Sequence, residues 1–168
     1  MSHEVLWGGK PANITGAEIK VGDKAPANFT LTANNMSPVT GADLAGKPRI
    51  YCTIPSVDTG VCDTEMRRFN TEAAKVPGVT IYAISVDLPF AQKRWCGAAG
   101  VEQVQTLSDY KDRSFGPAFG TFVADKGLLV RAVFVVDKND TVTHVEYVAS
   151  VGSEPNYEAA LNAAKALV

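Results

Sequence analysis

Three cysteines are the residues of this sequence best suited to covalent chemistry, and Cys62 has the most distinctive position. It follows a strand-like segment and a short polar loop, where a helical pattern begins. If Thr59 caps that helix, Cys62 is its third residue, where free backbone N–H groups and the helix dipole favour a thiolate. Cys62 is therefore a candidate nucleophile, although a buried thiol that opens the apolar face of the helix is an equally good explanation.

A thiolate at Cys62 requires a nearby cation. Asp63 and Glu65 are close in sequence, and negative neighbours disfavour a further negative charge. Arg131 is the candidate cation because it interrupts the apolar run from Leu128 to Val136, where an unpaired charge is costly. Two interpretations remain open. The guanidinium either faces the Cys62 sulfur or forms an ion pair with a helix carboxylate.

The other two cysteines call for different interpretations. Cys96 lies at the end of a second short helical segment, and neither it nor Cys62 is part of a Cys-x-x-Cys motif. Cys52 alternates with Ile50 and Ile54 on one face of a predicted strand, while Arg49, Tyr51 and Thr53 occupy the other. This pattern indicates that Cys52 is a small core residue.

The sequence lacks the residues that several other catalytic classes require. Cysteine hydrolases need a histidine base, but only His3 and His144 occur, and both are expected at the surface. The sequence contains neither cysteine and histidine pairs at zinc-binding spacing nor a glycine-rich nucleotide motif. We therefore expect neither a metal nor an organic cofactor.

These candidate residues must be positioned by alternating strands and helices. Predicted strands cover Val5 to Trp7, Ala12 to Thr15, Phe29 to Thr32, Val39 to Thr40, Arg49 to Ile54, Val79 to Val86, Gln103 to Leu107, Leu128 to Val136 and Thr141 to Val148. Predicted helices run from Cys62 to Val76, from Pro89 to Gly97, and from Pro155 onward with Tyr157, Leu161, Ala164 and Val168 on one face. This order predicts an α/β fold with a central mixed sheet flanked by helices and an N-terminal β-hairpin, and a thioredoxin-like arrangement of the strands fits it.

Length and composition are those of one globular domain spanning residues 1–168. The chain is 46% hydrophobic and 20% charged, with a net charge of −2. A nearly neutral chain is poorly suited to the phosphate backbone, so we expect no nucleic-acid partner. The sequence shows neither a signal peptide nor an apolar run of membrane-spanning length, so we expect no membrane association and a cytoplasmic location.

Three segments, in order along the chain, resemble the peroxiredoxin family. Pro55, Thr59 and Cys62 form a Pro-x-x-x-Thr-x-x-Cys motif that resembles the peroxiredoxin active-site signature. The longer run 55–62, with Arg67, Phe69 and Asn70 after it, is similar to the thiol peroxidase subfamily. The run 85–92 leading into Trp95-Cys96-Gly97 looks like the segment around that subfamily's second cysteine. Residues 131–137 look like the strand that carries the family's active-site arginine.

The resemblance implies a thiol-dependent peroxidase that reduces hydrogen peroxide and alkyl hydroperoxides. In this family the first cysteine becomes a sulfenic acid, a role that falls to Cys62, with Pro55, Thr59 and Arg131 around it. Cys96 would then form an intramolecular disulfide with Cys62, as in atypical two-cysteine peroxiredoxins. Thioredoxin would reduce that disulfide. The resemblance also implies a homodimer with contacts near the active-site loops.

Several alternatives and consequences accompany this interpretation. The same cysteine pair would serve a redox sensor or a disulfide-exchange protein.

Phe90, Phe115 and Phe119 are expected either to line an apolar pocket for alkyl or lipid hydroperoxides or to pack in the core. Because Cys62 begins a core-facing helix stripe and Cys96 ends another helix, a bond between them requires local unwinding.

Overall fold

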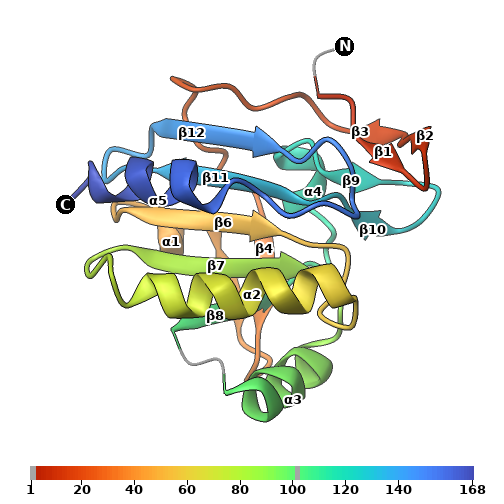
Figure 1. The fold of residues 1–168 in the computed structure, drawn as a ribbon, viewed down its shortest axis with the longest axis horizontal. Coiled ribbons are helices and arrows are strands. Elements are labelled where there is room, and N and C mark those ends of the chain that lie inside the picture. The colour runs from red at the N-terminus through yellow and green to blue at the C-terminus, as the bar shows by residue number, and fades with distance from the viewer. Residues whose placement is uncertain (1–2, 101–102) are drawn as a thin grey trace.

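A seven-stranded mixed sheet forms the centre of the fold in the computed structural model, which describes residues 3–100 and 103–168 (Figure 1). Its strands, in spatial order, are β12 (Val142–Tyr147), β11 (Ala132–Val136), β6 (Arg49–Thr53), β7 (Thr80–Ser85), β8 (Val104–Ser108), β4 (Thr30–Ala33) and β5 (Pro38–Thr40). Strands β6, β7 and β8 are parallel, and the remaining pairs are antiparallel. The predicted thioredoxin-like fold with a mixed sheet is confirmed.

The two faces of this sheet support separate cores. Ile50 and Cys52 of β6 point into one core, and Tyr51 points into the other. This alternation is the predicted one, and it arises because successive strand residues point to opposite faces. Helices α2 (Gly60–Ala73) and α5 (Tyr157–Lys165) cover the first core, on the side nearer the viewer in Figure 1.

Two short helices cover the other face, and neither was predicted. These are α1 (Gly41–Leu44) and α4 (Phe115–Ala118), which contribute Leu44 and Phe115 to the second core. Helix α3 (Pro89–Ala99) packs near β8 instead of over the centre of the sheet (Figure 1). As predicted, α3 begins with proline at its first position, and it ends at Gly100 in the left-handed conformation with φ 68°.

The structure corrects the predicted N-terminal segment. A hairpin is present, but it joins β1 (Leu6–Trp7) to β2 (Lys10–Pro11), so its strands are shorter and closer than expected. The next strand, β3 (Ile14–Thr15), pairs with β9 (Phe122–Val123) of a separate three-stranded sheet. The C-terminal helix is likewise shorter than expected, because it ends at Lys165 and leaves Val168 exposed.

The predicted continuous strand from Leu128 to Val136 is also wrong. It is divided into β10 (Leu128–Leu129), which pairs with β9, and β11, which pairs with β6 and β12. The chain passes from one sheet to the other at Val130 and Arg131. There the Val130 N–H donates to the Thr121 carbonyl and the Val130 carbonyl accepts from the Thr53 hydroxyl. This crossing places Arg131 beside α2 rather than in a sheet ladder.

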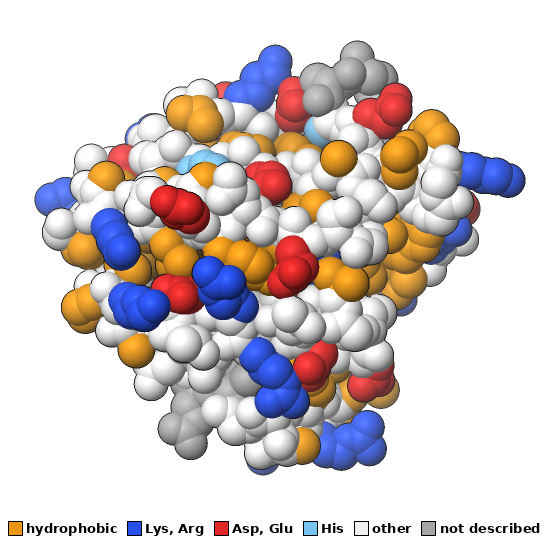
Figure 2. Space-filling view, in the orientation of Figure 1, with side chains coloured by type: hydrophobic (Ala, Val, Ile, Leu, Met, Phe, Trp, Pro, Cys, Tyr) orange, Lys and Arg blue, Asp and Glu red, His pale blue; other side chains and the backbone are white. Residues whose placement is uncertain are grey.

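The surface over α2 and α5 shows basic and acidic side chains interspersed (Figure 2). This mixture agrees with a chain whose net charge is −2. Within the described ranges, no helix has both the length and the apolar character needed to cross a membrane.

Candidate active site

Cys62 is the third residue of α2, as its spacing from Thr59 predicts. Thr59 is the N-cap with φ −87° and ψ 147°, and its Oγ1 accepts a hydrogen bond from the Cys62 backbone N–H at 3.2 Å. The Thr59 hydroxyl in turn donates to the Ser56 carbonyl at 3.3 Å. Pro55 is buried in the same loop, and the Cys62 side chain is fully buried. The strand-to-helix junction therefore presents the thiol from the end of the helix that favours negative charge.

Arg131 makes both of the contacts that its position allowed. Its Nη1 donates to the Cys62 Sγ at 3.0 Å and to the Glu65 Oε2 at 2.6 Å, while Nη2 donates to the Val151 carbonyl at 2.8 Å. Arg131 and Glu65 are almost completely buried. One guanidinium thus lies between a thiol and a carboxylate in a low-dielectric environment.

The charges of this cluster shift one another. Burial raises the pKa of Glu65 to about 7, although the attraction of Arg131 acts in the opposite direction. Burial alone would lower the pKa of Arg131, but Glu65 and Cys62 hold it above its usual value. Arg131 therefore keeps its positive charge, and both the Cys62 sulfur and the Glu65 carboxyl group accept a hydrogen bond from it.

Asp63, the second acidic neighbour of Cys62, forms an ion pair with Arg67 at the surface. Asp63 accepts hydrogen bonds from Arg67 Nε at 2.8 Å and from Trp95 Nε1 at 2.9 Å. The hydrogen bond from Arg67 has the largest effect on the pKa of Asp63 and lowers it. The bond from Trp95 also lowers this pKa, whereas burial raises it. Trp95 belongs to α3, so this contact also ties the helix that carries Cys96 to the first turn of α2.

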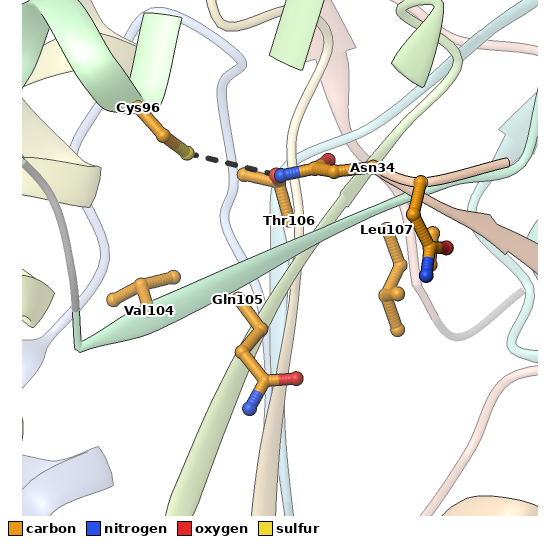
Figure 3. Close-up of a pocket in the computed structure, with 8 residues that line it drawn as sticks. Asn34, Cys96, Val104, Gln105, Thr106 and Leu107 are labelled. Carbon is orange, nitrogen blue, oxygen red and sulfur yellow. Dashed lines mark hydrogen bonds between the residues drawn. The ribbon is translucent and has the colours of Figure 1, made fainter. Parts of the chain in front are cut away.

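Cys96 is a free thiol, as are Cys52 and Cys62. Its sulfur lies 3.6 Å from the Thr106 Oγ1 on β8, at the side of a cavity of about 430 Å³ (Figure 3). Burial raises the pKa of the Cys96 thiol. Cys52 is fully buried in the core of the sheet, where burial raises the pKa of its thiol well above normal, as an inert core residue requires.

A polar network beside the Cys62 loop was not predicted. The Asp87 carboxylate accepts hydrogen bonds from Ser56 Oγ at 2.7 Å, Val57 N–H at 2.9 Å and Ser85 Oγ at 2.6 Å. Buried Gln92 of α3 donates to the same Ser85 hydroxyl at 3.0 Å. The available signal was the position of Asp87 just after a parallel strand, at the edge where the carboxyl ends of β6 and β7 meet.

Of the two interpretations of the aromatic residues, core packing is confirmed for Phe115 and Phe119, and they form no pocket with Phe90. Phe115 and Phe119 stack on each other in the core on the opposite face of the sheet from Cys62, with ring centroids 4.2 Å apart. Phe90 is 65% exposed at the start of α3.

His3 is not a surface residue, because its ring packs 4.7 Å from the ring of Tyr147 and is only 7% exposed. His144 is half-buried on β12. Cys62 forms hydrogen bonds with Thr59 and Arg131 and with neither histidine. Across residues 3–100 and 103–168, no group of three or more histidine, cysteine, aspartate or glutamate side chains is arranged to hold a metal ion.

Fold and site together define a thiol protein of the Redoxin class, whose family model matches residues 20–161. Among solved structures, the peroxiredoxin-like protein from Aquifex aeolicus superposes with a TM-score of 0.91 and 35% identity, covering 100% of this chain and 99% of that one.

Curated relatives narrow the class. The thiol peroxidase of Halalkalibacterium halodurans is 55% identical over 96% of this chain and 97% of its own length. That of Bacillus subtilis is 52% identical over 98% of each. The chain therefore belongs to the thiol peroxidases of the Redoxin family, peroxiredoxin enzymes that reduce hydroperoxides.

Proposed function

We propose that Cys62 is the residue that attacks the hydroperoxide. The Cys62 thiolate forms a bond to the terminal peroxide oxygen and the O–O bond breaks. The remaining oxygen takes a proton and leaves as water or an alcohol, and Cys62 becomes a sulfenic acid. The observation that carries this proposal is the 3.0 Å hydrogen bond from Arg131 Nη1 to the Cys62 Sγ at a helix N-terminus.

Arg131 and the cap of α2 supply the electrostatics of this step. The guanidinium stabilises the thiolate, and Glu65 and the Val151 carbonyl hold its plane in place. Arg131 Nε makes no hydrogen bond to any residue of the described ranges, so a donor remains for the charge that develops on the leaving oxygen. Pro55 and Thr59 shape the loop that a peroxide must enter.

Cys96 acts second and resolves the sulfenic acid as an intramolecular disulfide with Cys62. A dithiol reductant of the thioredoxin type then restores both thiols by disulfide exchange. Such a cycle operates in the cytoplasm, where reductants keep thiols available. The peroxide preference includes alkyl hydroperoxides, because the apolar face of α2, with Met66 and Phe69, continues from Cys62 beyond the Arg131–Glu65 pair.

The active form is a homodimer that contacts its partner near the Cys62 loop. Leu88 and Phe90, which are 52% and 65% exposed, lie one and three positions after Asp87, the residue whose carboxylate binds that loop. Charged residues flank this surface, and Arg94 shares a shallow pocket with Leu88 and Phe90.

Steady-state peroxide consumption with thioredoxin, thioredoxin reductase and NADPH tests the proposal. Wild-type protein should turn over, Cys62→Ser should be inactive, and Cys52→Ser should retain activity. Cys96→Ser should lose turnover with thioredoxin while still reacting once with peroxide. A redox sensor would be oxidised once and would not sustain turnover, so this measurement also separates the two functions.

A further inference from the structure

The Cys96 thiol is held by two polar side chains that play no part in the proposed reaction. Its sulfur contacts Thr106 Oγ1, and the Thr106 hydroxyl donates to the Asn34 Oδ1 at 3.0 Å. Figure 3 shows these three side chains converging from α3, β8 and the end of β4. We call Thr106 and Asn34 the Thr106–Asn34 anchor.

The direction of these hydrogen bonds defines the state that the anchor holds. A hydroxyl carries one proton, and the Thr106 proton is directed to Asn34. Thr106 Oγ1 is therefore an acceptor toward Cys96, and the thiol donates its S–H. Burial raises the pKa of the Cys96 thiol, and the Thr106 hydroxyl lowers it by a smaller amount, so the balance favours the protonated thiol. The anchor holds this thiol at β8 by the contact with Thr106.

This resting place is far from the place where Cys62 is held. Arg131, which binds the Cys62 sulfur, precedes β11, and Thr106 lies on β8, with β6 and β7 between them. Ala132 and Leu107 belong to the same cross-strand row, so the separation is across the sheet. Three strand spacings separate the backbones of Arg131 and Thr106 by about 14 Å, and each sulfur contacts a different one of these two side chains, whereas bonded sulfurs are about 2 Å apart. Cys96 must leave its anchor, or Cys62 its arginine, before a disulfide forms.

We propose that the Thr106–Asn34 anchor retards disulfide formation by holding Cys96 in its resting position, and so prolongs the life of the Cys62 sulfenic acid. Thr106 is a positioning residue in this account, which rests on the proposed function of Cys96. Release breaks the contact between the Cys96 S–H and Thr106 Oγ1. The Cys96 sulfur then bonds to the Cys62 sulfur, the S–O bond breaks, and hydroxide leaves with the thiol proton as water.

A longer-lived sulfenic acid faces a competing reaction. A second hydroperoxide oxidises it to a sulfinic acid and is itself reduced to water or an alcohol, and thioredoxin does not reverse this product. The anchor therefore sets the balance between disulfide formation and irreversible oxidation at high peroxide.

The test compares Thr106→Val with wild type in single-turnover stopped-flow experiments that separate Cys62 oxidation from disulfide formation. Valine keeps the shape and the strand preference of threonine but cannot accept the S–H bond. Disulfide formation should become about two- to tenfold faster, the range expected for the loss of one hydrogen bond. The fraction of Cys62 found as sulfinic acid by mass spectrometry after cycling in excess peroxide should fall in proportion.

Matched variants separate this effect from general loosening of the fold. Thr106→Ser keeps the hydroxyl and should match wild type, whereas Thr106→Ala should accelerate disulfide formation as valine does. Gln105→Ala changes the same cavity on the other side of the strand and should have no effect. An unchanged or slower rate in Thr106→Val overturns the anchor alone. Failure of wild-type protein to form a Cys62–Cys96 bond overturns both the anchor and the proposed role of Cys96.

Discussion

Arg131 is the residue on which the site depends, because one buried guanidinium serves both the Cys62 sulfur and the Glu65 carboxylate. Its planar arrangement of donors allows contacts to the sulfur, the carboxylate and the Val151 carbonyl at once. A lysine ammonium supplies charge without that geometry. We therefore expect the proposed reaction to require arginine in particular and not merely a positive charge.

Replacing Arg131 with lysine should lower kcat/KM for peroxide by about a hundredfold, comparable to the loss of one preorganised donor at an oxyanion. Stopped-flow measurement of Cys62 oxidation checks this. Arg49→Lys is the matched control, because Arg49 is also buried and paired with Asp140, but at the opposite end of β6. A similar rate loss in both variants would mean that the effect comes from folding.

Glu65 should make stability depend on pH. Its pKa is about 7 in the folded protein, mainly because of burial, and its ordinary value is 4.5. The folded state thus binds the proton more tightly, so this contribution is fully present below pH 4.5 and is lost as the pH rises through 7. Urea midpoints at pH 5 and pH 8 for wild type and Glu65→Gln measure it. The wild-type protein should lose more stability between the two pH values than the variant does, and equal losses would contradict the assignment.

At the scale of elements, the loop before α2 is held by Asp87 rather than by its own hydrogen bonds alone. Asp87 binds the loop at Ser56 and Val57, and through Ser85 it reaches Gln92 of α3. The loop before α2 and helix α3 therefore share one partly buried polar network. A change in this network should affect both the position of the loop and the stability of the protein.

Asp87→Asn replaces one acceptor oxygen with a donor that faces other donors. The variant should lose about 1–3 kcal/mol of unfolding free energy, and Cys62 oxidation should slow about tenfold or more because the loop is misplaced. Denaturant unfolding and stopped-flow kinetics measure the two effects. Asp58→Asn, an exposed position of the same loop, should change neither. A wild-type oxidation rate in Asp87→Asn would show that the network does not position Cys62.

Disulfide formation should unwind parts of two helices. Amide hydrogen exchange should be faster in the oxidised than in the reduced protein over the first turn of α2 and over α3, while β7 keeps its protection. The reason is that Arg131, which binds the Cys62 sulfur, directly precedes β11, whereas Thr106, which contacts the Cys96 sulfur, lies on β8, three positions away in the sheet. Identical protection of both helices in the two redox states would be incompatible with this account.

At the scale of the whole molecule, patterns among neighbouring residues were enough to predict most of the longer strands and helices. The alternation in β6, the apolar face of α2 and the Thr59 cap each involve only neighbours in sequence, and the structure agrees with them. The short helices α1 and α4 lacked such a pattern, because a single helical turn has no periodicity to detect.

The predictions failed where the structure depends on contacts between residues that are far apart in the sequence. An aromatic residue in the sequence indicates burial but not which face of the sheet it joins, so the choice between a pocket and the core stayed open for Phe115 and Phe119. The same limit hid the break at Arg131, since β10 and β11 pair with different sheets. The Asp87 network combines side chains from three segments, and the partners of such polar groups follow only from the assembled fold.

The most direct test of the central claim is peptide mapping of the protein after one equivalent of hydroperoxide, without reduction. We predict one intramolecular bond between Cys62 and Cys96 in wild type, with Cys52 unmodified. In Cys96→Ser the sulfenic acid should remain on Cys62, where dimedone traps it. A bond that includes Cys52, or a Cys62 that stays reduced while peroxide is consumed, would contradict the account.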